Sequence, residues 1–138
     1  MKISHDIHNN IKVLTAITPQ AVGTTGVAND KLSAAIDRKG YGSAEFTYHS
    51  GASATGTDTI TPIVYEGDTT NGSFTSVAAG SLLGSETALT LTSAGVINRV
   101  GYRGNKRYLK LRLYGTGTAT AIVAAQAILS TPEAAPVA

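Results

Sequence analysis

Apolar and polar residues alternate along most of this sequence, and Gly, Asn, Asp or Pro interrupt the alternation at intervals of about 8–12 residues. Residues 43–50 are an example, because Ala44, Phe46 and Tyr48 fall on one side of an extended chain while the residues between them fall on the other. This pattern is typical of strands that bury one face. It predicts an all-β fold, a single-domain antiparallel β-sandwich or barrel of about eight strands.

Pro62 makes the strand predicted at residues 59–66 unusual. Proline has no N–H group to donate to a neighbouring strand, so we expect this strand at an edge of its sheet or at a bulge. The turn that follows contains Asn71 and Gly72, a pair suited to positive φ, and it predicts a hairpin with residues 74–77.

The clearest hairpin is predicted in the second half of the chain, where residues 96–102 and 108–114 both alternate and only five residues separate them. Its second strand presents an apolar face made of Leu109, Leu111 and Leu113. Residues 118–129 are expected as the final strand. Between the two hairpins, residues 78–84 predict a single helical turn or an apolar plug, and residues 88–92 predict a strand.

Residues 29–39 fit two local structures. Asn29 and Asp30 are suited to cap a helix, whereas residues 34–36 fit a strand that ends in a turn at residues 37–40. We favour the strand, because the segments on either side are β-like.

Three regions follow from these elements. Residues 1–28 are expected to be an N-terminal arm with a first strand, at residues 11–18, and a loop. Residues 29–130 are expected to form the β domain, and residues 131–138, which contain two prolines, an extended C-terminal tail.

Composition narrows the class of protein. Of 138 residues, 42% are hydrophobic and only 14% are charged, which excludes a coiled coil and a chain kept disordered by its charge. The absence of cysteine excludes disulfides, thiolate zinc sites and cysteine nucleophiles. No apolar leader segment begins the sequence, and the longest mainly apolar stretch, residues 119–129, is too short for a membrane helix. We therefore expect a protein made in the cytoplasm with no membrane partner.

Candidate catalytic and metal-binding residues are few. His5 and His8 flank Asp6 at a spacing that can hold a metal, but no further ligand lies near them in the sequence. His49 is the third and last histidine, on the polar side of its predicted strand. The glycine-rich segments lack the residues of a phosphate-binding loop, and no serine lies in a nucleophile motif. We expect no catalytic residue, no cofactor and no bound metal, and thus a protein that is not an enzyme.

Charge is distributed unevenly. Residues 99–112 contain six of the eleven Lys and Arg residues and no acid: Arg99, Arg103, Lys106, Arg107, Lys110 and Arg112. Three tyrosines are interleaved with them, namely Tyr102, Tyr108 and Tyr114. A basic and aromatic stripe of this kind fits a solvated sheet face, a protein interface or a nucleic-acid site. The net charge of only +2 makes nucleic acid the least expected of these partners.

One segment resembles a known family. Residues 101–108, Gly-Tyr-Arg-Gly-Asn-Lys-Arg-Tyr, resemble a hairpin motif of small proteins encoded among the head genes of tailed bacteriophages. Weaker matches extend the resemblance over about residues 34–138, at residues 35–37 with Gly40, 43–46, 65–68, 74–77, 127–129 with Pro132, and 135–137.

The resemblance implies a virion structural protein, a capsid decoration (cement) protein on the outside of the shell. Its partners would be the major capsid protein and further copies of itself, in a homotrimer. The expected capsid or subunit contacts are Ile3, His5, Ile7, His8, Arg99, Tyr102, Arg103, Lys106, Arg107, Tyr108, Arg112 and Tyr114. Two alternatives remain: a neck or tail component, and a carbohydrate-binding β-module that uses Tyr102, Tyr108 and Tyr114 as platforms for sugar rings.

Overall fold

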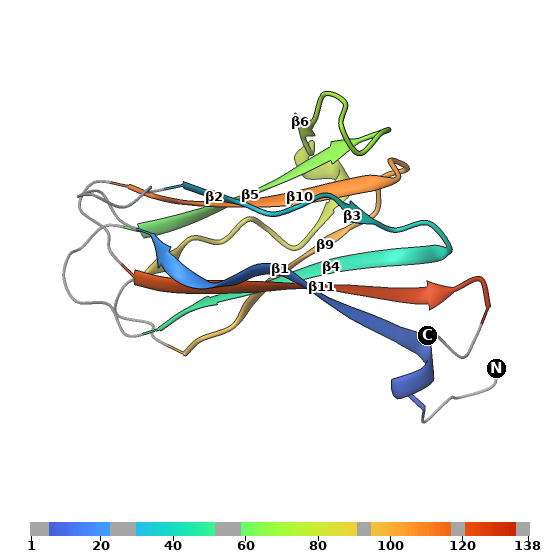
Figure 1. The fold of residues 1–138 in the computed structure, drawn as a ribbon, viewed down its shortest axis with the longest axis horizontal. Coiled ribbons are helices and arrows are strands. Elements are labelled where there is room, and N and C mark those ends of the chain that lie inside the picture. The colour runs from blue at the N-terminus through green and yellow to red at the C-terminus, as the bar shows by residue number, and fades with distance from the viewer. Residues whose placement is uncertain (1–5, 23–29, 52–58, 91–94, 117–120, 135–138) are drawn as a thin grey trace.

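In the computed structural model, the described residues are 6–22, 30–51, 59–90, 95–116 and 121–134. Within them, eleven strands form two antiparallel sheets that pack face to face (Figure 1). The predicted all-β sandwich is confirmed. The strands outnumber the eight expected partly because Asp30–Leu32 and Leu82–Leu83 form strands of three and two residues, too short for an alternating pattern to show.

Sheet A contains the first and last strands of the chain side by side. Its order is β1 (Ile11–Val22), β11 (Ala121–Pro132), β4 (Tyr41–Ser50), β9 (Asn98–Tyr102) and β7 (Leu82–Leu83). The edge strand β1 pairs irregularly with β11 on both sides of Ile17 and carries Pro19. Bulges and proline discourage edge-to-edge association, so this long edge is partly protected.

Sheet B is built around β10 (Tyr108–Gly115), the strand with the three alternating leucines. Its order is β2 (Asp30–Leu32), β10, β5 (Thr59–Gly67) and β6 (Thr75–Ser76), with β3 (Ile36–Asp37) on β10 and β8 (Leu89–Thr90) on β5. Two short 3₁₀ turns complete the described structure, η1 (His8–Asn10) and η2 (Ala79–Ser81). The helical turn predicted within residues 78–84 is η2, but Leu82 and Leu83, expected in that turn or in an apolar plug, form the strand β7.

The core lies between the inner faces of the two sheets. Sheet A contributes Ala44, Phe46 and Tyr48 from β4 and Val123, Ala125, Ala127 and Leu129 from β11, and sheet B contributes Ile60, Val64, Leu109, Leu111 and Leu113. The core thus combines small alanine side chains from β11 with large leucine side chains from β10, as in two sheets packed about 10 Å apart.

Two local predictions are confirmed. Residues 30–37 contain strands, β2 and β3, and not a helix, although residues 33–35 lie between the two strands and not in the strand expected at residues 34–36. The β5–β6 hairpin forms, with Tyr65 opposite Ser76. Pro62 pairs with Leu113 on the β10 side, and no described strand pairs with it on the other side, where β6 and β8 cover only the two ends of β5. Pro62 therefore lies at a local edge, although its strand as a whole is internal to sheet B.

Two turn predictions are wrong in detail. Gly72 does not have positive φ; its hydrogen faces Thr69, whose Oγ1 would lie 2.2 Å from an added Cβ. The turn before β4 is formed by residues 38–41, one residue later than expected, with Tyr41 N–H donating to the Arg38 carbonyl. Gly40, at φ +85°, takes its third position, where positive φ requires glycine.

The largest correction concerns residues 96–114, which do not form a hairpin. β9 pairs with β4 and β7 in sheet A, whereas β10 pairs with β2, β3 and β5 in sheet B. The short connection between β9 and β10 thus crosses from one sheet to the other (Figure 1). Alternation shows which side of each strand is buried but not which sheet it joins.

Candidate functional site

The crossing between β9 and β10 is organised by the buried side chain of Tyr102, which is 2% exposed. Its hydroxyl donates to the Glu66 carboxylate and accepts a hydrogen bond of 3.0 Å from the Lys106 N–H. Burial, and then the hydrogen bond to Glu66, raise the pKa of Tyr102 to about 12. We call Tyr102, Arg38, Glu66, Gly104 and Lys106 the Tyr102 junction.

Arg38 and Gly104 complete the Tyr102 junction. The Arg38 guanidinium lies 5.1 Å from the centre of the Tyr102 ring and donates to the carbonyls of Gly104 and Lys106. A Cβ on Gly104 would lie 2.3 Å from the Tyr102 hydroxyl oxygen, so only glycine fits there. The motif that resembles a phage hairpin is therefore the connection that joins the two sheets.

Basic residues of the cluster at residues 99–112 are paired with acids that are distant in the sequence. The shortest N–O distances are 2.6 Å for Arg112–Asp30, 2.7 Å for Arg107–Asp37, 2.7 Å for Lys106–Asp68 and 3.7 Å for Arg99–Glu45. The hydrogen bond from Arg107 holds the pKa of Asp37 below its usual value, and the hydrogen bond to Asp30 raises the pKa of Arg112. The acid-free stripe of the sequence is thus largely neutralised in the fold.

The tyrosines of the cluster take three different positions. Tyr102 is in the junction. Tyr108 is 9% exposed beneath the Arg107 guanidinium, which lies 4.8 Å from its ring centre. Tyr114 is half-buried on the outer face of sheet B under Arg112, also at 4.8 Å. The three rings therefore do not form one exposed platform.

Arg103 is exposed and does not share the face of Arg107 and Arg112. Its Nε donates to the Gly80 carbonyl over 2.9 Å, and it borders a shallow groove on the outer face of sheet A. The groove lies over Gly101, between Leu83 and Ile128, and its volume is about 310 Å³.

The outer face of sheet A is otherwise neutral. Aliphatic side chains project from three of its strands: Val13 is 56% exposed, Leu83 53% and Ile122 50%. Thr47 and Gln126 lie between them and hydrogen-bond to each other. Glu45 and Arg99 form the ion pair of this face.

The predicted N-terminal contacts are only partly within the described residues. Ile3 and His5 lie outside them. Ile7 is 70% exposed, and His8 begins η1, where Asp6 accepts hydrogen bonds from Asn9. Among the described residues, no group of three or more His, Asp or Glu side chains is placed to hold a metal ion, and no helix has the length and apolarity to cross a membrane.

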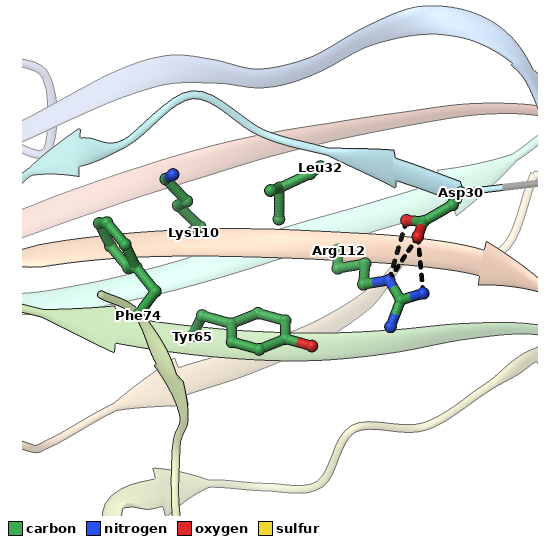
Figure 2. Close-up of a pocket in the computed structure, with 6 residues that line it drawn as sticks. All are labelled: Asp30, Leu32, Tyr65, Phe74, Lys110 and Arg112. Carbon is green, nitrogen blue, oxygen red and sulfur yellow. Dashed lines mark hydrogen bonds and ion pairs between the residues drawn. The ribbon is translucent and has the colours of Figure 1, made fainter. Parts of the chain in front are cut away.

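A second hollow, on the outer face of sheet B, was not predicted. Its volume is about 300 Å³, and we call it the aromatic pocket; it is lined by Asp30, Leu32, Tyr65, Phe74, Lys110 and Arg112 (Figure 2). The alternation at residues 59–66 places Tyr65 outward, since Val64 before it is buried. Its position opposite Lys110 comes from the β5–β10 pairing, which no local pattern shows.

Comparison with known proteins identifies no family: no family model and no curated protein matches the sequence. A structure of infectious bursal disease virus, Gx strain, is 12% identical with a TM-score of 0.48, over 90% of this chain and 32% of the other. The CBM22-1–GH10 modules of Clostridium thermocellum xylanase 10B, complexed with xylohexaose, are 14% identical with a TM-score of 0.43, over 95% and 28%. The chain spans about a third or less of each, and neither likeness bears on function. The fold therefore defines the class of protein, which is an antiparallel β-sandwich domain.

Proposed function

We propose that this protein is a non-enzymatic structural component of a tailed-bacteriophage virion, which binds the outer surface of the capsid and stabilises the shell. The observation that carries the proposal is the Tyr102 junction. The residues that resemble the phage motif, Tyr102, Gly104 and Lys106 among them, act together as one structural unit. The residues that carry the resemblance thus have a shared structural role in this chain, and this supports the proposal.

The outer face of sheet A is the surface that we assign to the shell. Protein interfaces are depleted of charge at their centres, and burying a neutral face avoids the cost of desolvating ions. Val13, Leu83 and Ile122 supply apolar area there, and Arg103 lies at its rim. The partner is the major capsid protein, and the N-terminal segment with Ile7 adds a second contact.

Association into a closed trimer would strengthen the attachment. Cyclic assembly presents several identical faces to a symmetric shell, and linked weak contacts gain affinity through effective concentration. Sedimentation equilibrium tests this part of the proposal: a mass of three chains supports it, and a strict monomer at every concentration refutes it.

Quantitative mass spectrometry of purified particles from the phage that encodes the chain tests the function itself. The proposal expects a copy number comparable to that of the major capsid protein. A handful of copies per particle would instead make the protein a neck or tail component. Absence from the particle would overturn a virion role altogether.

A further inference from the structure

The aromatic pocket has the composition of a ligand site. Phe74 lies beside Lys110 at one end, Asp30 and Arg112 form the other, and the Tyr65 ring lies between them (Figure 2). The residues that line the pocket come from the three strands β2, β5 and β10, together with Phe74, which precedes β6. A hollow of about 300 Å³ is at the lower end of the range of small-ligand sites.

Lys110 is the cation of this pocket that has no carboxylate partner among the described residues. Its Nζ lies 4.2 Å from the centre of the Phe74 ring, whereas Arg112 beside it is engaged by Asp30. Phe74 in turn packs against Gly67, where an added Cβ would lie 3.1 Å from the ring. The ammonium group is therefore held at the wall of the hollow by a rigid aromatic support, available to an anion.

The opposite end of the pocket offers a donor and an acceptor next to each other. Arg112 Nε donates to both oxygens of Asp30, at 2.9 and 2.8 Å, and both side chains are partly exposed. Each carboxylate oxygen accepts more than one hydrogen bond and the guanidinium has five donors, so capacity remains for a ligand. Hydroxyl groups, which donate and accept at once, match this pair.

We propose that the aromatic pocket binds an acidic sugar unit of a glycan. A pyranose ring has an apolar C–H face to lie on Tyr65 or Phe74, hydroxyls for Asp30 and Arg112, and a carboxylate for Lys110. An acidic peptide fits less well, because its carboxylates would pair with Lys110 and its N–H groups could donate to Asp30, but it has no apolar ring face to lie on Tyr65 or Phe74. The site lies on the opposite sheet from the surface assigned to the capsid and does not depend on that assignment.

Titration of the full ¹⁵N-labelled chain by NMR tests the proposal. The probes are tetragalacturonate and sialyllactose, two sources of sugar carboxylate, with galactotetraose and lactose as their neutral counterparts and tetraglutamate as the acidic peptide. We expect at least one acidic sugar to shift the amides of Tyr65, Lys110 and Arg112 with a dissociation constant of about 1 mM or below, and its neutral counterpart to bind about tenfold more weakly.

Two variants and a matched control locate the binding. Lys110→Gln should weaken the acidic sugar about tenfold without affecting the neutral one, and Phe74→Leu, which keeps an apolar side chain against Gly67, should weaken both. Lys39→Gln removes an exposed lysine outside the pocket and should leave affinity unchanged. An amide NMR spectrum that matches the wild type away from the substituted residue confirms that each variant is folded.

Three results with the wild-type chain would overturn the proposal. They are the absence of shifts with both acidic sugars at about 10 mM, equal affinity for acidic and neutral sugars, and binding of tetraglutamate in preference to the sugars. Binding that survives Lys110→Gln unchanged would likewise exclude this pocket as the site.

Discussion

The two outer faces of the sandwich differ in how many charged side chains they carry and in how these side chains are paired. On sheet B, Arg107 and Arg112 are tied to aspartates and lie over tyrosine rings, and the face is patterned with alternating aromatic and charged groups. On sheet A, threonine, glutamine and aliphatic side chains predominate, and within the described residues its outer face has one ion pair, at 3.7 Å. Sheet B therefore carries most of the basic and aromatic residues that stand out in the sequence, and most of its charges are already paired within the chain.

This difference shows why a count of charges does not locate an interface. An ion pair that is already formed must be desolvated before a dry partner can cover it, and its interaction with a new partner rarely offsets that cost. A neutral face with exposed Val13, Leu83 and Ile122 has no such penalty. We therefore assign the large protein contact to sheet A, and to sheet B only a small polar ligand.

The largest effect is expected from breaking the Tyr102 junction, because the two faces exist only while the sheets remain packed. Tyr102→Ala should lower the free energy of unfolding by about 3–5 kcal/mol, as for other large aromatic residues removed from cores. Tyr102→Phe should cost about 1–3 kcal/mol, since it keeps the ring but leaves Glu66 and the Lys106 N–H without their partner.

Urea denaturation followed by circular dichroism measures both values. If Tyr102→Ala were to unfold at the same urea concentration as the wild type, the Tyr102 side chain would not join the sheets as described.

A charge placed on either outer face should distinguish the two surfaces. Leu83→Lys puts a cation at the β7 edge of the outer face of sheet A and should weaken binding to capsids that lack the protein by about tenfold or more, without unfolding the chain. Thr61 is half-buried on β5, opposite Tyr114 in sheet B; Thr61→Lys is the control and should bind like the wild type. Cosedimentation of each variant with capsids gives the affinities. The reverse order of effects would move the shell contact to sheet B.

A smaller effect is expected from the ion pairs of sheet B, and it depends on pH. Arg107 lowers the pKa of Asp37 in the folded state below the value of 3.8 that applies when unfolded. The pair therefore contributes stability that is present above pH 3.8 and is lost as the pH falls through the folded-state pKa. Asp37→Asn should be slightly less stable than the wild type at neutral pH, and the difference should vanish in acid.

Thermal denaturation across that pH range measures this difference. Glu45→Gln on sheet A is the comparison, since its longer ion pair should contribute less at neutral pH. A gap between Asp37→Asn and the wild type that stays constant into acid would show that Asp37 acts through packing rather than through its charge.

Several features of this protein were predictable from short stretches of the chain. The alternation of Leu109, Leu111 and Leu113 correctly predicted a buried face, and residues 59–66 with 74–77 correctly predicted a hairpin. Those predictions depend on residues within one strand or across one tight turn. The aromatic pocket was not predictable in this way, because Asp30, Tyr65 and Lys110 come from three separate strands.

Sequence alone determined the fold class and which side of each main strand faces inward, because side-chain direction in a strand has a period of two residues and is set locally. Only the tertiary structure decided that β9 and β10 belong to different sheets, that Tyr102 joins them, and that acids at positions 30, 37 and 68 neutralise the basic cluster. The physical reason is that strand pairing and burial depend on residues about 40 to 80 positions apart. These residues come together because burying apolar surface in one common core lowers the free energy of the chain.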